Sequence, residues 1–281
     1  MFPANFSYLT FNWLSDCIAN TNFTFLDLFV EIFLDKRSLP QNTLVAEKNG
    51  KTASMLFLLD GKIKVADKIL KTYYLYAAAT LKEFRGKGIM AQMLKEAGKL
   101  AQDRGVDLIC LKPAEKSLYE FYKNHGYNTV FATKFAALKI KSSALHDREE
   151  NCADVFAARE TAFTSSDRFI WDKDAIEFAV NQHKYYGGKV FENCEGYCLY
   201  SVDDTACSVK EISFTSQNAL KVLSQIASAE QIEEFRIELP VDYPIDAECV
   251  FIADNGMALL ISDESQFLKN RNDLYLNLTL D

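Results

Sequence analysis

The sequence predicts an α+β protein of two domains, each with a mixed, mostly antiparallel sheet flanked by helices. Its 281 residues are many for one domain and comfortable for two. In the first half, segments with strand character precede one long amphipathic helix, a short apolar strand and closing strands. The second half repeats this order of elements, which indicates a tandem duplication even though no sequence identity between the halves is visible.

The first half begins with a helical stripe of apolar side chains over residues 22–35. Residues 42–68 predict strands joined by a turn at Asn49-Gly50, and Asp60-Gly61 repeats the turn signal. A strand follows at residues 72–81, and an amphipathic helix runs from after Gly88 to near Gly105. An apolar strand at residues 106–114 and a short helix at 115–126 come next, and strand-like segments continue to about Ile140.

The second half follows a polar and charged stretch at residues 141–150, which we interpret as the linker between the domains. Helical patterns cover residues 153–162, 173–185 and 216–231, with Ser216 as the cap of the last. Strand patterns cover residues 189–193, 196–202, 206–214, 234–240, 248–254, 257–263 and 274–280.

Composition and charge exclude several classes of function. A net charge of −8 argues against nucleic acid as the partner. No apolar run approaches the roughly 18–20 residues that span a bilayer, and the N-terminus lacks the basic start of a signal peptide. The seven scattered cysteines indicate reduced thiols and a cytoplasmic setting, and the three distant histidines predict no metal site.

The segment Glu83–Gly105 combines two glycines and two cations just where a helix begins. A helix start offers unpaired N–H groups and a positive dipole, and glycine lets the backbone approach a ligand closely. We therefore expect the turn at Arg85, Gly86, Lys87 and Gly88 to bind a pyrophosphate, with amides as far as Ala91. An ordinary glycine turn with solvated cations is the alternative, because neither the ATP-binding loop nor the dinucleotide fingerprint is present.

The turn reads R-x-x-G-x-[GA] from Arg85, except that Met90 fills the last position. Downstream, Tyr122, Gly126 and Tyr127 match Y-x-x-x-G-[FY]. Over about residues 25–140, the chain resembles the GNAT N-acetyltransferase superfamily. A bulky residue at the Met90 position is similar to the two-domain enhanced intracellular survival acetyltransferases, although their third domain is missing here. This resemblance implies tandem GNAT-like folds, with a catalytic domain at residues 1–145 and a degenerate one without a coenzyme A loop at 146–281.

The resemblance implies transfer of an acetyl group from acetyl-CoA to a primary amine by direct attack in a ternary complex, without a metal. Tyr122 is then the acid that protonates the leaving thiolate, with Tyr119 as the competing candidate. Further contacts with the cofactor are implied for a larger set of residues. They are Ala78, Ala79, Thr80, Arg85, Gly86, Lys87, Gly88, Ile89, Met90, Ala91, Ser117 and Leu118.

The base remains open, because the strand 72–81 carries no carboxylate. Glu83, Glu31, Asp35 or a water relay are the candidates, and Glu115 occupies the place of the family's asparagine. Aromatic residues of the second domain either line the acceptor site or fill a core, namely Phe169, Trp171, Tyr185 and Tyr186.

Three other classes of function stay open beside the transferase. They are a non-catalytic acyl-CoA-binding or regulatory module, an aminoacyl transferase that uses charged tRNA, and a structural protein without a ligand. The expected acceptor is a small-molecule or protein amine, with no membrane partner. A homo-oligomer also stays open.

Overall fold

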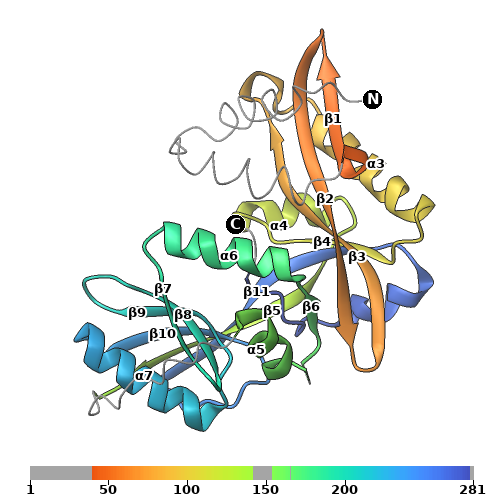
Figure 1. Cartoon of the computed structure of the whole chain (residues 1–281). Coiled ribbons are helices and arrows are strands. Elements are labelled where there is room, and N and C mark those ends of the chain that lie inside the picture. Colours follow the sequence, from red (N-terminus) through yellow and green to blue (C-terminus); the bar gives the residue numbers. More distant parts are fainter. Residues whose placement is uncertain (1–39, 142–153, 165, 279–281) are drawn as a thin grey trace. The chain divides into compact units, whose positions relative to one another are not determined.

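The computed structural model describes residues 40–141, 154–164 and 166–278 (Figure 1). The predicted helix at residues 22–35, with Glu31 and Asp35, and most of the predicted linker lie outside these ranges. The chain divides into two compact units. The first contains residues 1–62, 70–128 and 257–269, and the second contains residues 63–69, 129–256 and 270–281.

The first unit is a sheet in the order β1-β2-β3-β4-β11. The first four strands are β1 (Thr43–Lys48), β2 (Lys51–Val65), β3 (Lys68–Thr80) and β4 (Leu108–Leu111). Its helices are α3 (Ile89–Asp103) and α4 (Lys116–Lys123). Pairs β1–β2 and β4–β11 are antiparallel and β3–β4 is parallel, so the predicted mixed, mostly antiparallel α+β fold is confirmed.

The turn at Asn49-Gly50 is confirmed, since both residues have positive φ, 54° and 71°, between the paired strands β1 and β2. The turn predicted at Asp60-Gly61 is wrong, because β2 continues through both residues to Val65. Ile63 and Val65 are buried on alternate positions beyond that point, so burial favours continuing the strand over the local turn signal. The chain reverses instead at Ala66, where φ is 50°.

Both helices of the first unit share a hydrophobic cluster with one face of its sheet. Buried positions two apart, Leu56 and Leu58 on β2 and Ile109 and Leu111 on β4, point to this face. Helix α3 contributes the predicted apolar stripe, of which Met93, Leu94, Ala97 and Ala101 are buried. Helix α4 contributes Tyr122, while Tyr127 follows the end of α4.

Strand β11 (Cys249–Leu260) comes from the far end of the chain and enters the first unit through its last residues. Met257 pairs with Leu111 and Leu260 with Leu108. Asp107 fixes this end, because its carboxylate accepts hydrogen bonds from the Lys71 amide at 2.8 Å and the Ser262 hydroxyl at 2.7 Å.

The compact units therefore differ from the two consecutive segments 1–145 and 146–281. Strand pairing is not local in sequence, so residues 257–269 join the first unit and residues 129–141 join the second. Strand β5 (Asn128–Lys139) pairs antiparallel with β10, from Lys139 opposite Glu234 to Lys134 opposite Leu239.

The remaining elements belong to the second unit. Its helices are α5 (Val155–Ala162), α6 (Lys173–Tyr185) and α7 (Ser216–Glu230), as predicted to within a few residues. Its strands, besides β5 and the start of β11, are β6 (Arg168–Ile170), β7 (Lys189–Asn193), β8 (Gly196–Val202), β9 (Cys207–Ile212) and β10 (Glu234–Leu239). Helix α7 covers a core built from β5, β8, β9 and β10, with Leu223 and Ile226 buried.

Three details of the second unit differ from the predictions. Within residues 248–263, the single strand β11 (Cys249–Leu260) replaces the two predicted strands. Of the strand predicted at residues 274–280, the described part to Leu278 forms no full strand; Leu274 and Tyr275 make isolated bridges, to Phe131 and Arg168. The cap of α7 is Thr215 instead of Ser216.

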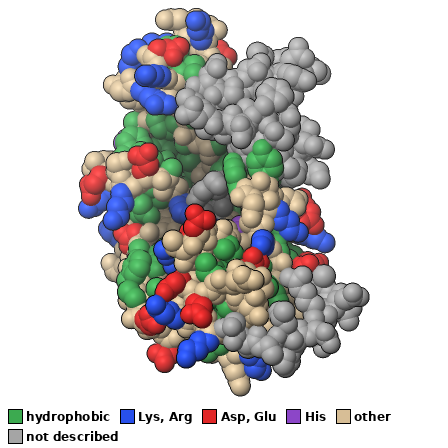
Figure 2. Space-filling view, turned by 90° about the vertical axis from the view of Figure 1, so that its left-hand side faces the viewer, with side chains coloured by type: hydrophobic (Ala, Val, Ile, Leu, Met, Phe, Trp, Pro, Cys, Tyr) green, Lys and Arg blue, Asp and Glu red, His purple; other side chains and the backbone are tan. Residues whose placement is uncertain are grey.

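No described helix is long and apolar enough to cross a membrane. Of the described cysteines, Cys110, Cys198 and Cys207 are buried and Cys194 and Cys249 are exposed, all as free thiols. Acidic and basic side chains are interspersed over the face in Figure 2.

Candidate functional site

The last residues of β3 are not paired with the neighbouring strand β4. The parallel register of β3 and β4 runs from Thr72 opposite Leu108 to Tyr74 opposite Cys110, whereas β3 continues to Thr80. Ala77 lies just beyond the last pair and has a φ of 49°. Only a few per cent of non-glycine residues adopt positive φ, and such backbone strain is concentrated at functional sites. Apart from the run of alanines, no local pattern in the sequence predicts this irregularity.

Ser54 anchors the last residues of β3. Its hydroxyl is buried, donates to the Ala79 carbonyl at 2.8 Å and lies 2.9 Å from the Thr80 hydroxyl. The Leu81 amide donates to the Ala53 carbonyl at 3.0 Å. Two residues of β2 therefore hold the strand where the glycine turn starts. Sequence reasoning did not identify Ser54, since a serine within an apolar strand has no distinctive pattern.

The glycine turn has a backbone that other residues rarely adopt. Gly86 has a φ of 72° and Gly88, the cap of α3, has a φ of 74°, and a Cβ added at either would meet no atom within 4 Å. The glycines are thus required by conformation and not by crowding. Within the described residues, the amides from Gly86 to Ala91 donate to no other group, and the first paired amide is Gln92, which donates to the Gly88 carbonyl at 3.1 Å. The positive end of α3 therefore presents unpaired donors.

The two cations of the turn are partly used to hold it. Arg85 Nε donates to the Thr80 carbonyl at 2.8 Å, and Lys87 Nζ donates to the Glu83 carbonyl at 2.7 Å and lies 5.5 Å from the centre of the Phe84 ring. Both side chains keep their positive charge beside the unpaired amides. Met90 is half-buried and packs on the hydrophobic cluster, so its bulk points into the core.

Helix α4 brings the predicted acid to the same cluster. Tyr122 is 8% exposed, and its ring meets those of Phe121 and Tyr127 edge to face, with centroids 5.3 and 5.5 Å away. Burial raises the pKa of Tyr122 to about 12. The phenol is therefore protonated at neutral pH. Tyr119, the competing candidate, is half-buried against the same cluster.

The start of α4 carries the two residues expected near the cofactor. Ser117 is exposed, and its hydroxyl donates to Glu115 Oε2 at 3.2 Å. Leu118 packs on the hydrophobic cluster, and its amide donates to the Glu115 carbonyl at 3.0 Å. Glu115 caps the helix without a hydrogen bond from its side chain to the backbone.

One cluster therefore joins several of the predicted residues. Its members among them are Ala78, Ile89, Met90, Leu118, Tyr119 and Tyr122. The base candidate Glu83 lies elsewhere, exposed in the short 3-10 turn Lys82–Phe84.

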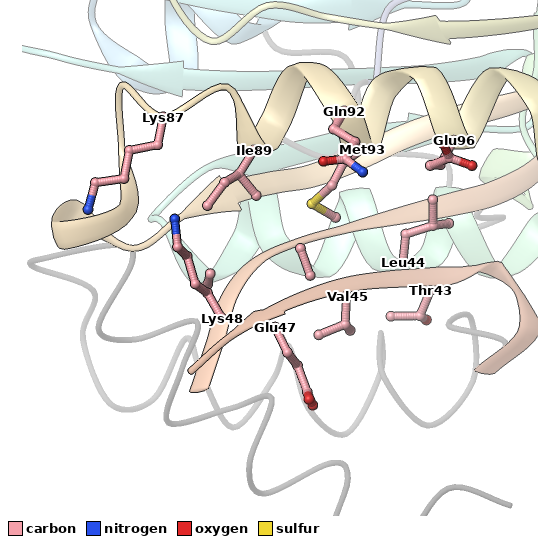
Figure 3. A pocket seen from close by; sticks show the side chains of 12 residues that line it. Thr43, Leu44, Val45, Glu47, Lys48, Lys87, Ile89, Gln92, Met93 and Glu96 are labelled. Carbon is pink, nitrogen blue, oxygen red and sulfur yellow. The ribbon is translucent and has the colours of Figure 1, made fainter. Parts of the chain in front are cut away.

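A groove of about 700 Å³ runs between β1 and α3 (Figure 3). Of the predicted residues only Lys87 and Ile89 line it. Figure 3 shows the Lys48 side chain directed toward the turn before α3, while the Glu47 carboxylate points away. The groove thus adjoins the glycine turn, but Tyr122 is not among its lining residues.

The second unit lacks a similar turn. Helix α7 follows Thr215, which has an extended backbone, and no glycine lies at this junction. Phe169 and Trp171 are 1% and 2% exposed and belong to the core, whereas Tyr185 and Tyr186 are 37% and 63% exposed. Within the described ranges, no group of histidine, cysteine and carboxylate side chains is arranged to hold a metal.

Comparisons with known proteins agree with this geometry. A family model described as "Acetyltransferase (GNAT) domain" matches residues 17–130. Similar structures include a probable N-acyltransferase of Enterococcus faecalis V583 (TM-score 0.70, 14% identity, 92% of this chain and 71% of that one). A GCN5-related N-acetyltransferase of Anabaena variabilis is similar with a TM-score of 0.71 and 13% identity, over 93% of this chain and 71% of that one. Eis1 of Mycobacterium abscessus is similar with a TM-score of 0.67 and 11% identity, over 93% of this chain and 73% of that one. A search of curated proteins found no match. The unpaired helix start, the separated strand and the family match agree with one another, and residues 17–130 are similar to the acetyltransferase (GNAT) domain family.

Proposed function

We propose that the chain transfers an acetyl group from acetyl-CoA to a primary amine by direct attack in a ternary complex. The observation that carries the proposal is the run of amides from Gly86 to Ala91 at the start of α3, which donate to no other described residue and lie within the segment that matches the GNAT acetyltransferase domain. Such a run suits a pyrophosphate, because a single phosphate would not use all of the donors.

The residues of the site have separate tasks in this proposal. Arg85 and Lys87 add charge beside the amides, and Ile89, Met90 and Ala91 form the first turn of the helix that binds the pyrophosphate. Ser117 and Leu118, at the start of α4, would contact the pantetheine arm.

The separated end of β3 would hold the reacting thioester. The backbone of Ala78, Ala79 and Thr80 would orient the carbonyl, with small side chains that leave space beside it. The amine nitrogen then forms the new bond to the acetyl carbon as the carbon–sulfur bond breaks. Tyr122 gives its phenolic proton to the departing sulfur, a step that its raised pKa of about 12 allows by keeping it protonated. The proton of the amine leaves through water or a carboxylate.

The second candidate function is a non-catalytic acyl-CoA-binding or regulatory module. The strand from Lys68 to Thr80 carries no carboxylate, and Glu83 is exposed. This favours a domain that keeps the cofactor turn without a dedicated base. The two candidates differ in turnover, since only the transferase releases coenzyme A in the presence of an amine.

The two units take different roles in the proposal. The first carries the cofactor site, and the second binds no coenzyme A because its helix α7 starts without glycine. The acceptor is a small-molecule or protein amine, acetyl-CoA is the co-substrate, and the setting is cytoplasmic.

The test is thiol release from acetyl-CoA in the presence of an aminoglycoside, a polyamine, an amino acid and a lysine peptide, with mass spectrometry of the acetylated product. We expect release with at least one amine and loss of about a hundredfold or more in kcat for Tyr122→Phe. Calorimetric titration with coenzyme A runs in parallel. Binding without release in any mixture would favour the non-catalytic module, and no binding would contradict both candidates.

A further inference from the structure

Tyr127 carries a buried hydroxyl that the proposed reaction leaves without a role. The side chain is 2% exposed, and its hydroxyl has no hydrogen-bond partner among the residues that the structure describes. It follows Gly126, whose φ of 87° closes α4, and its amide donates to the Tyr122 carbonyl at 3.1 Å. The turn thus ties Tyr127 directly to the residue proposed as the acid.

The two phenol rings are in contact. Tyr122 and Tyr127 pack edge to face with centroids 5.5 Å apart, inside the hydrophobic cluster shared by β2–β4, α3 and α4. Cys110 of β4 is the other ionisable group close enough to affect Tyr127, and it is fully buried. Burial, with the charges that Tyr122 and Cys110 would carry, raises the pKa of Tyr127 far above its usual range. Tyr127 therefore stays a neutral donor whenever Tyr122 loses its proton.

A buried hydroxyl without a partner destabilises a fold, because it has given up its bonds to water. A phenylalanine ring would fill the same space without that cost. A tyrosine that serves packing alone is thus a poor choice here, and a hydroxyl that gains its partner only during the reaction explains it better.

We propose that Tyr127 is a positioning residue for Tyr122, whose hydroxyl donates a hydrogen bond, directly or through one water, to the Tyr122 oxygen when that oxygen is negatively charged. The inference rests on the proposed function, in which Tyr122 is the acid. As the sulfur gains the proton, the O–H bond of Tyr122 breaks and the negative charge moves from sulfur to the phenol oxygen. Tyr127 keeps its own proton throughout, and Tyr122 is reprotonated from solvent.

The test compares Tyr127→Phe, Tyr122→Phe and the double variant by kcat, by KM for acetyl-CoA and by thermal unfolding. We expect Tyr127→Phe to lower kcat by about tenfold to a hundredfold, the effect of one hydrogen bond to a charged oxygen, with KM unchanged. Its melting temperature should be unchanged or higher. In the Tyr122→Phe background, Tyr127→Phe should have no further effect, because it acts through Tyr122.

Thr133→Val is the matched control. Thr133 in β5 is also fully buried, and its hydroxyl too finds no partner in the described part of the chain, but it belongs to the second unit. Removing its hydroxyl should leave kcat and KM as in the wild type while keeping or raising the melting temperature.

The outcomes separate this inference from the proposed function. If Tyr122→Phe abolishes turnover and Tyr127→Phe keeps the wild-type kcat, the positioning role is overturned and the proposed function stands. Additive losses in the double variant, with a lower melting temperature, would show a structural role and also overturn it. If Tyr122→Phe keeps the wild-type kcat, or the wild type releases no thiol with any amine, the acid assignment and the positioning role both fall.

Discussion

The Ser54 hydroxyl lies 2.8 Å from the Ala79 carbonyl oxygen and 2.9 Å from the Thr80 hydroxyl, and these two bonds fix the end of β3. The same strand end supports the glycine turn through Arg85, whose Nε binds the Thr80 carbonyl. Ser54 thus stabilises the proposed site from the neighbouring strand without being part of it.

Ser54→Ala should lower the free energy of unfolding by about 1–3 kcal/mol, since it leaves two groups of the strand end without their partner. KM for acetyl-CoA should rise, because the strand end and the turn lose their anchor. Urea unfolding and steady-state kinetics measure the two effects. Thr215→Ala is the control, because Thr215 is exposed and makes no capping bond. A Ser54→Ala protein with unchanged KM would show that the anchor is dispensable.

Ala77 offers a test of the irregularity in β3. Its φ of 49° is energetically unfavourable for alanine and more unfavourable for a β-branched residue. Ala77→Val should therefore lose roughly 1–3 kcal/mol of unfolding free energy and most of the turnover. Ala77→Gly should stay close to wild type in both, because glycine adopts this φ without strain. Equal behaviour of the two variants would contradict a role for the left-handed backbone.

The sequence predicted those parts of the fold whose signals are local. The Asn49-Gly50 turn, the apolar stripe of α3 and the all-apolar strand β4 all follow from neighbouring residues. The glycine turn was also predictable, since glycines before an amphipathic helix form a short continuous pattern. Tyr122 lies on α4, and Gly126 and Tyr127 of the same motif follow the end of that helix.

The remaining features depend on contacts between distant segments. The pairing of Met257 with Leu111 joins residues far apart in the chain, and no local pattern announces it. Asp60-Gly61 looks like a turn, yet burial of Ile63 and Val65 extends the strand past it. The φ of Ala77 and the bond from Ser54 likewise depend on the tertiary setting.

Gly88 and Gly105 allow a matched test of the phosphate turn. They flank the same helix, have φ of 74° and 61°, and neither has an atom within 4 Å of an added Cβ. Alanine at either position should lower the free energy of unfolding by about 1–2 kcal/mol, because an alanine there would have to adopt the left-handed backbone conformation. Only Gly88→Ala should weaken binding of coenzyme A, measured by calorimetry. Equal affinities in the two variants would place the pyrophosphate elsewhere.

Arg159 and Glu211 form a fully buried ion pair in the second unit, with Nε 3.0 Å from Oε1. The hydroxyls of Tyr197 and Tyr275 also donate to the Glu211 carboxylate. Arg159→Met should cost about 3–5 kcal/mol of unfolding free energy, because it leaves a buried carboxylate without its cation. The exposed pair Lys139–Glu234, 2.8 Å apart, is the control, and Lys139→Met should unfold close to the wild type. Similar losses in both variants would contradict the importance of burial.

Tyr122 makes the free energy of unfolding depend on pH in the alkaline range. Its pKa is raised to about 12 by burial, against about 10 in an unfolded chain. The folded state therefore binds the phenolic proton more tightly, and this stabilisation is complete below about pH 10 and is lost as the pH rises toward 12. The two-unit difference corresponds to roughly 2–3 kcal/mol for this residue. The buried phenols of Tyr127, Tyr197 and Tyr275 have raised pKa values as well and act in the same direction.

Urea unfolding of the wild type should give a free energy that falls steadily between about pH 9 and pH 12, while Tyr122→Phe should fall less steeply over the same range. The absorbance of phenolate near 295 nm, followed in the folded protein, should show one titrating tyrosine fewer in the variant only at the upper end of that range. If the free energy of unfolding fell equally steeply with pH in both proteins, the Tyr122 phenol would titrate like an exposed one. Tyr122 would then lie in water, and not in the apolar cluster that makes it a candidate acid.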